Sequence, residues 1–209
     1  MSAVSHPPKS SIPSIVGMNL QIETGRVRLR AFETADVEAI WPYVSDPAVA
    51  QYLSWAAHRT REETEAWIEK ARTRTETDVV WALEAGGTVV GCIDLHGITW
   101  QLKACRVDRA ELGFWLAPPL WNRGLMTEAA HAVTQFAFHQ IGLHKVMVGC
   151  FEANTGSRRV IEKLGFRYIG RQEDNVWRDG TWHAHLQYEL TAGEWPDVQT
   201  TMRIMRPSV

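Results

Sequence analysis

Apolar and polar residues alternate along several short segments of the chain, a pattern that predicts β-strands. In residues 26–32 (RVRLRAF), the apolar side chains share one face and the arginines share the other. A Gly-Gly pair at 86–87 and an Asp-Gly pair at 179–180 are typical of two-residue hairpin turns. Residues 145–151 (KVMVGCF) are apolar on both faces, which favours a buried, parallel strand. The pattern predicts strands at 26–32, 79–85, 88–96, 108–117, 145–151, 167–177 and 181–190.

Between these strands, apolar residues spaced three or four apart predict helices. The longest one has an apolar stripe made of Met126, Ala130, Val133, Ala137 and Ile141. Gly142 and Gly165 follow the last two helices, at the place where a left-handed residue commonly ends a helix. Asn154 is placed to cap the start of the last helix. Helices are expected at 35–44, 46–53, 61–75, 123–141 and 155–164.

Length and composition favour one domain, which we place at residues 25–192 of the 209. Residues 1–24 are rich in Ser and Pro, so a flexible tail or a surface strap is expected there, and 193–209 is expected to be a C-terminal tail. A net charge of -2 gives no basic surplus for binding nucleic acid. The three cysteines form no C-x-x-C pair, which argues against a disulfide framework or zinc knuckle. The chain shows neither a membrane-spanning run nor a signal-peptide pattern, so we expect a cytoplasmic protein without membrane contact.

The segment 120–130 (LWNRGLMTEAA) is the most informative stretch for function. A short polar turn ends at Gly124 and leads directly into an amphipathic helix. The first N–H groups of a helix lack carbonyl partners and carry partial positive charge, so they form a ready site for phosphate. Gly124 has no side chain and lets a diphosphate approach the backbone. Neither of the two common nucleotide loops, G-x-x-x-x-G-K-[ST] and G-x-G-x-x-G, occurs in the chain.

Three segments taken together resemble the GNAT N-acetyltransferases: ELGFWL at 111–116, WNRGLMTEA at 121–129 and NTGSRRVIEKLGF at 154–166. The second is similar to the acyl-CoA loop W-G-x-G-x-x-T-E-A of the RimJ/RimL-type branch, and the third to its N-x-x-S…K-L-G-F segment. Trp121 stands where the wider family has Gln or Arg, and Asn122 where the branch has Gly. The resemblance covers residues 26–190. It implies the GNAT fold, an α/β (α+β) domain with a mixed, mostly antiparallel sheet of six to seven strands and helices on both faces.

The resemblance also implies acetyl-CoA as the acetyl donor, a primary amine as the acceptor, and no metal. Its diphosphate would bind the turn and the first helical amides, namely Asn122, Arg123, Gly124, Leu125, Met126 and Thr127. The pantetheine arm would pair, like an added strand, with the edge formed by Phe114, Trp115 and Leu116. Asn154 is either a hydrogen-bond partner of this arm or a helix cap, and the two roles are compatible.

Glu111 is the candidate base, acting through water, because several GNAT enzymes carry a glutamate at this position. Alternation puts Glu111 on the same face as Gly113 and Trp115, so a bulge or a splay of the sheet must expose its carboxylate. The alternative role is a solvated edge residue that pairs with Arg109. Other candidate bases are Glu173, Asp174 and the pair His183 and His185.

Ser157 is the candidate acid for the leaving thiolate, because it matches the serine of the branch motif; the alternative is polar filling of the first helical turn. An amide near Leu116 could stabilise the oxyanion. No cysteine resembles an acyl carrier, so direct transfer in a ternary complex is favoured.

The acceptor pocket is the part of the site that the sequence defines least. Four tryptophans are candidates for its wall: Trp55, Trp100, Trp177 and Trp182. The last two flank the predicted 179–180 turn, so the alternative is that they pair across the hairpin or form a homodimer contact. The branch suggests the α-amine of a protein N-terminus as acceptor, and a small-molecule amine is the other candidate. A non-catalytic acyl-CoA sensor and a nucleotide-binding protein are the competing functions.

Overall fold

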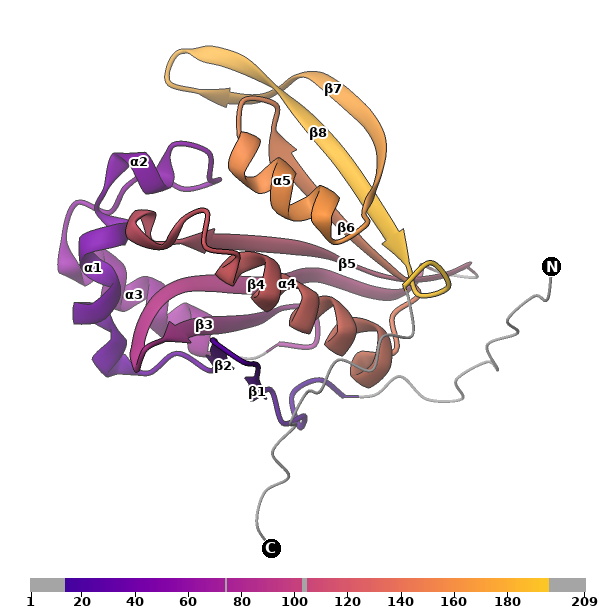
Figure 1. Ribbon diagram of the computed structural model, residues 1–209, viewed down its shortest axis with the longest axis horizontal. Helices are drawn as coiled ribbons and strands as arrows, with labels where there is room; N and C mark the ends of the chain where they lie inside the picture. Colours follow the sequence, from indigo (N-terminus) through magenta and orange to yellow (C-terminus); the bar gives the residue numbers. More distant parts are fainter. Residues whose placement is uncertain (1–13, 74, 103–104, 196–209) are drawn as a thin grey trace, which may run out of the picture.

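A single eight-stranded sheet organises the computed structural model, which describes residues 14–73, 75–102 and 105–195 (Figure 1). The strand order is β1-β2-β3-β4-β5-β6-β8-β7. Neighbouring strands are antiparallel except β5 and β6, which run parallel as predicted. The strands are β1 (Ile22–Glu23), β2 (Arg28–Arg30), β3 (Val79–Ala85), β4 (Thr88–Leu102), β5 (Cys105–Leu116), β6 (Lys145–Phe151), β7 (Arg167–Arg178) and β8 (Thr181–Thr191).

Helices cover both faces of the sheet, so the predicted fold class is confirmed. The α-helices are α1 (Val37–Val44), α2 (Pro47–Ala50), α3 (Arg61–Arg72), α4 (Leu125–Phe136) and α5 (Thr155–Lys163). Short helical turns precede α1 and α4, and a π-helical turn, Ala137–Ile141, extends α4 to the predicted end at Gly142. The strand count is eight rather than six to seven, because β1 lies in the segment expected to be a tail. Within the described residues, no helix is long and apolar enough to cross a membrane.

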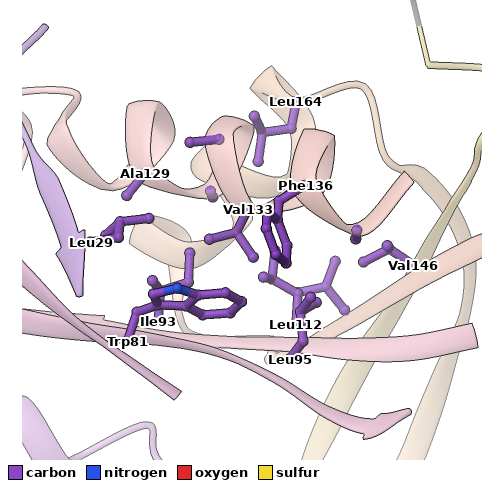
Figure 2. Close-up of a cluster of buried hydrophobic side chains, with 14 of the residues drawn as sticks. Leu29, Trp81, Ile93, Leu95, Leu112, Ala129, Val133, Phe136, Val146 and Leu164 are labelled. Atoms are coloured by element: carbon purple, nitrogen blue, oxygen red, sulfur yellow. The ribbon is translucent and has the colours of Figure 1, made fainter. Parts of the chain in front are cut away.

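The larger core lies between the sheet and α4, and Figure 2 shows its centre. Trp81 of β3 is fully buried and its ring meets Phe136 of α4 edge to face, with 5.8 Å between ring centroids. Val133 belongs to the apolar stripe predicted for this helix and packs in the same cluster. The other face of the sheet packs against α1 and α3 in a smaller core that contains Ile40 and Trp115. Because side chains alternate along a strand, neighbouring residues of β3 and β5 supply opposite cores.

The N-terminal segment from residue 14 onward is packed, which corrects the expectation of a flexible tail over 1–24. Ile15, Leu20 and Ile22 are buried in the larger core, and β1 pairs with β2. The indole N–H of Trp81 donates to the Leu20 carbonyl over 2.6 Å, so this segment supplies the partner that a buried indole requires. At the other end, Trp195 is also buried and stacks near Phe138 at 5.9 Å, so packing continues past the predicted boundary at 192. The remaining tail residues, 1–13 and 196–209, lie outside the described residues.

Local signals placed the turns and caps correctly. The residues at 86–87 and at 179–180 all have positive φ, as type I′ hairpin turns require. Gly142 ends the α4 region in the left-handed conformation with φ 80°. The Asn154 side chain caps α5 by accepting the N–H of Ser157 over 3.0 Å. One prediction about β6 was only partly right: its burial alternates, so one face is buried and the other is partly open.

The feature that positions the site is the divergence of β5 from β6. These strands pair only at Arg109–Glu111 and Lys145–Met147, although β5 continues to Leu116 and β6 to Phe151. Figure 1 shows β6 and β8 turning away from β5, with α2 lying near the wide end of the opening. Beyond Glu111, one edge of β5 therefore has no neighbouring strand within the described parts of the chain.

Candidate active site

The turn before α4 has the geometry of an anion site. Asn122 and Gly124 both have positive φ, at 61° and 77°, and this sharp turn brings the chain into the helix without a side-chain cap. The first helical bond here is from Glu128 N–H to the Gly124 carbonyl, at 3.0 Å. The N–H groups that precede it have no acceptor among the described residues, and they belong to Leu125, Met126 and Thr127. Together with the helix dipole, they favour a negatively charged ligand.

The turn is held from behind by the N-terminal segment. Arg26 donates from Nη1 to the Arg123 carbonyl at 2.8 Å and from Nε to Glu128 at 2.6 Å. Glu128 also accepts the Thr24 hydroxyl at 2.6 Å and the Arg26 N–H at 2.8 Å. Glu128 therefore projects away from the phosphate side of the turn, as expected, and it anchors the turn to the first strands. The contacts of Arg26 with Arg123 and Glu128 could not be predicted from the sequence, because no motif surrounds Arg26.

The backbone of β5 faces two directions in alternation. Ala117 N–H donates to the Val90 carbonyl of β4 at 2.8 Å, so alternate residues back along β5 also bond to β4. Trp115 is one of them, which means that its backbone cannot pair with an added strand, contrary to its place in the predicted set. The backbone groups of Phe114 and Leu116 face the opening toward β6.

One of these backbone groups, the Leu116 carbonyl, is already hydrogen-bonded to the side chain of Trp121. Its indole Nε1–H donates to the Leu116 carbonyl over 2.6 Å, while its side chain stays largely exposed. The N–H of Leu116 and both backbone groups of Phe114 remain on the open edge of the strand. This edge offers the alternating donors and acceptors that an extended amide-containing chain needs.

One pocket of about 520 Å³ joins the turn, the open strand edge and the start of α5. The predicted cofactor residues that line it are Phe114, Trp115, Leu116, Asn122, Gly124, Leu125, Met126, Thr127, Asn154 and Ser157. Arg123 does not line it, because the turn directs this residue outward, where its carbonyl meets Arg26.

Several lining residues were not predicted. Arg159 and Lys163, one helical turn apart on α5, bring two positive charges to the pocket. Gln51 and Tyr52, which follow α2, line its other side, and the Tyr52 ring lies 5.8 Å from that of Phe151 on β6. Their positions depend on the packing of α2 beside the divergent strands β5 and β6, and no local sequence motif predicts it.

Asn154 and Ser157 lie at the start of α5, on the pocket wall. The cap bond uses Asn154 Oδ1 as an acceptor, and the amide N–H₂ has no hydrogen-bond partner among the described residues, so it is available to a ligand in the pocket. Ser157 contributes its backbone N–H to the cap, which leaves its hydroxyl available in the pocket. Both of the roles considered for Asn154 are therefore compatible in this geometry.

Glu111 lies at the point where β5 and β6 separate, and its side chain is about half exposed. Both features that could expose its carboxylate occur here: β5 and β6 separate after Glu111, and the β4–β5 register shifts beside it, between His96 and Thr99. Glu111 does not line the 520 Å³ pocket itself. Its Oε2 lies 3.8 Å from Nε2 of His96 of β4. Burial lowers the pKa of His185 on β8, and the nearby charge of Glu111 partly opposes that shift.

The four predicted acceptor-site tryptophans do not line this pocket. Trp177 and Trp182 face each other across the β7–β8 turn, 5.4 Å apart and more than half exposed. Trp55 packs edge to face against Trp115 at 6.4 Å, and Trp100 packs against the larger core. Trp177 and Trp182 therefore pair across the hairpin, and the role of the four tryptophans in the acceptor site stays a prediction.

The remaining candidates offer other chemistry. His183 and His185 share one face of β8 and both contact the Phe151 ring, at 5.7 Å. Among the residues that the structure describes, there is no group of three or more His, Cys, Asp or Glu side chains that could hold a metal ion. Burial raises the pKa of Cys150 to about 11, which disfavours its thiolate as a nucleophile at neutral pH.

A split mixed sheet with an anion-binding helix start at the split defines a GNAT-type acyltransferase. The family described as "Acetyltransferase (GNAT) domain" matches residues 26–167, and the chain belongs to this family. Its acetyltransferases use acetyl-CoA, so the protein is an acetyl-CoA-dependent acyltransferase.

Several known acetyltransferases are similar to the chain in sequence or in structure. It is 31% identical over 176 residues to the "Putative ribosomal N-acetyltransferase YdaF" of Bacillus subtilis, covering 81% of this chain and 93% of that protein. A GNAT-family acetyltransferase from Bacillus anthracis has a similar structure, with a TM-score of 0.74 and 26% identity over 84% of this chain and 100% of that one. RimJ of Mycobacterium smegmatis, solved with CoA-disulfide, shares the fold, with a TM-score of 0.71 and 23% identity over 84% of this chain and 88% of that one.

Proposed function

We propose that the protein transfers the acetyl group of acetyl-CoA to a primary amine by direct attack in a ternary complex, and that the α-amine of a protein N-terminus is the leading acceptor. A small-molecule amine is the other acceptor class. The observation that carries the proposal is that the unpaired amides of α4 and the open edge of β5 line one pocket. A ligand that joins a diphosphate to an extended amide chain matches both features.

The parts of the donor map onto the pocket in order. The diphosphate would accept from the N–H groups of Leu125, Met126 and Thr127, with Arg159 and Lys163 supplying positive charge nearby. The pantetheine amides would pair with the Phe114 backbone and the Leu116 N–H. The amide of Asn154 is close enough to the same channel to bond a carbonyl of the arm.

The chemistry then requires a base and an acid. A lysine amine has a pKa of about 10.4 and an α-amine one of about 7.7–8.0, so an α-amine loses its proton far more readily near neutral pH. Glu111 would accept this proton through water, since it lies outside the pocket wall. The free amine attacks the thioester carbonyl, the C–S bond breaks, and the Ser157 hydroxyl or a water protonates the leaving thiolate. The nitrogen then loses its second proton, which restores that hydroxyl or water, and the products are the amide and CoA thiol.

A free-thiol release assay with acetyl-CoA, a panel of N-terminal peptides and small amines tests the proposal. Thiol release that depends on the acceptor supports it. Tight acetyl-CoA binding with no release for any acceptor would support a sensor instead. Thermal shifts that rank ATP or NAD above acetyl-CoA would indicate a nucleotide-binding protein.

The role of Glu111 is tested by Glu111→Gln, which keeps the size and removes the basic carboxylate. We expect unchanged acetyl-CoA affinity and a turnover lower by about 10²–10⁴-fold, the usual worth of a general base. The loss should be greatest at acid to neutral pH, where the acceptor amine is protonated. Loss of acetyl-CoA binding in this variant, or an equal loss of turnover at every pH, would contradict the assigned role.

A further inference from the structure

Three polar side chains form a line beside the split in the sheet. His96 of β4 lies opposite Glu111 of β5 in the register, and Asp94 lies opposite Gly113, so all three side chains share one face. Asp94 Oδ1 is 2.6 Å from His96 Nδ1, and His96 Nε2 is 3.8 Å from Glu111 Oε2. The imidazole therefore lies between two carboxylates, one on each side.

Gly113 makes this arrangement possible. A Cβ atom at position 113 would lie 2.7 Å from Oδ2 and 2.9 Å from Oδ1 of Asp94, closer than real Cβ contacts come. The missing side chain leaves room for the Asp94 carboxylate to turn along the sheet toward His96. The glycine of the ELGFWL motif, Gly113, thus allows Asp94 on the neighbouring strand to reach His96.

The geometry also fixes which imidazole nitrogen carries the proton. An ionised carboxylate only accepts hydrogen bonds, so the short contact to Asp94 places the hydrogen of the neutral ring on Nδ1. The lone pair of Nε2 then faces Glu111. When the ring takes up a second proton, both of its N–H groups face carboxylates, so the charged form is accommodated as well. The side chain is 46% exposed, which gives the ring direct access to solvent.

We propose that His96, held in place by Asp94, takes over from Glu111 the proton that the acceptor amine loses and releases it to solvent. This inference rests on the proposed function of Glu111. The N–H bond of the ammonium breaks, its proton moves through water to the Glu111 carboxylate, then to His96 Nε2, and finally to buffer. The 3.8 Å gap is closed by a small side-chain movement or by one water. His96 acts only through Glu111 and Asp94 only through His96, so both are positioning residues.

The charges around His96 suit this role. The hydrogen bond to Asp94 raises the pKa of His96, burial opposes that shift, and the charges of Asp94, Glu111 and Asp78 add to it. Asp78 precedes β3 and accepts the Gly97 N–H at 3.2 Å, which holds it beside the ring. His185 of β8, which also feels the charge of Glu111, has its pKa lowered by burial, so it stays neutral near pH 7. An imidazole is the side chain best suited to accept and release protons near neutral pH.

The test compares the pH dependence of acetyl transfer in the wild type, His96→Gln and Asp94→Asn. In His96→Gln we expect kcat to fall at least about tenfold with the KM for acetyl-CoA unchanged, and added imidazole to restore part of the rate, since the site opens to solvent. In Asp94→Asn we expect the acid limb of kcat/KM to move to lower pH, because removal of the carboxylate lowers the pKa of His96. A purely structural role for Asp94 would change the rate without moving that limb.

Two controls make the outcomes separable. His139→Gln replaces an exposed histidine of the turn after α4 and should behave as the wild type. The His96 ring is also titrated by NMR in the wild type and in Asp94→Asn, which requires no turnover and should show the same lowered pKa. Wild-type kcat and pH profile in His96→Gln, or an unmoved His96 titration in Asp94→Asn, would overturn the relay while leaving the acetyltransferase proposal intact. A wild-type protein that acetylates no amine would overturn both.

Discussion

Substitution of Gly124 by alanine isolates the contribution of the turn before α4. Gly124 has φ 77° and ψ 4°, and a Cβ placed there would meet only Arg26 Nη2, at 3.5 Å, an ordinary contact. The alanine therefore fits in space, and its cost is conformational. An L-residue in the left-handed region costs about 1–2 kcal/mol. For a protein of this size, each kcal/mol of destabilisation lowers Tm by about 2–4 °C.

The same strain determines the expected effect on binding. The free turn can release it by leaving the left-handed region, and this movement would turn the N–H groups of Leu125, Met126 and Thr127 away from the diphosphate. Binding must then restore the strained geometry at a cost of about 1–2 kcal/mol, so the strain appears as a Kd for CoA weaker by about 5- to 30-fold in place of the loss of Tm. Gly124→Glu should abolish binding, because it adds bulk and a negative charge at the phosphate site.

Calorimetric titration of CoA and a thermal melt measure the two effects. Gly87→Ala is the matched control, since Gly87 also has a positive φ, at 79°, has open space at its Cβ position and lies outside the pocket; it should lower Tm and leave CoA binding unchanged. If Gly124→Glu binds CoA with wild-type affinity, the amides that open α4 do not hold the diphosphate. The assignment of the pocket would then be wrong.

Two further predictions concern the contacts that hold the site together. Burial tends to raise the pKa of Glu128, but hydrogen bonds from Thr24 and Arg26 outweigh it and lower this pKa. The ionised carboxylate therefore stabilises the fold at pH values above the unfolded-state pKa of about 4.3, and this stabilisation is lost as the pH falls through the lower pKa of the folded state. Glu128→Gln should therefore lower the free energy of unfolding by about 1–2 kcal/mol at pH 7. The resulting difference in Tm between variant and wild type should disappear below about pH 4, and a difference that does not change with pH would contradict this. Arg178 Nη1 donates to the carbonyls of Leu53 at 2.5 Å and Trp55 at 3.1 Å, which ties the β7–β8 hairpin to the loop after α2. Arg178→Met should lower the free energy of unfolding by about 1–3 kcal/mol and speed hydrogen exchange in that loop, and unchanged exchange would show that the tie has no effect on it.

Elements governed by short-range interactions could be predicted from the sequence. The turn at 179–180, the helix end at Gly142 and the cap at Asn154 each depend on the backbone preferences of one or two residues, and these were correct. The turn at Gly124, which leads into α4, belongs to the same class. The parallel pairing of β5 with β6 also followed from the apolar composition of one strand.

Predictions failed where a residue's role depends on distant partners. Residues 14–24 were expected to form a flexible tail or a surface strap, yet Ile15 and Leu20 are buried in the larger core with Trp81, which lies more than fifty residues away in sequence. Trp177 and Trp182 were candidates for the acceptor site. In the structure they contact each other across the hairpin and do not line the pocket, and their role in the acceptor site stays a prediction.

The sequence by itself determined the order of the strands from β2 onward and of the helices, the family, and the turn that leads into α4 at Gly124, because each of these depends on neighbouring residues. Only the tertiary structure decided where β5 and β6 separate, and so which backbone groups of Phe114 and Leu116 are open and which are bonded. It also brought Asp94, His96 and Glu111 into line across two strands, and Arg159 and Lys163 to the pocket wall. Strand register and helix packing set these contacts, and both depend on the whole sheet rather than on any one segment.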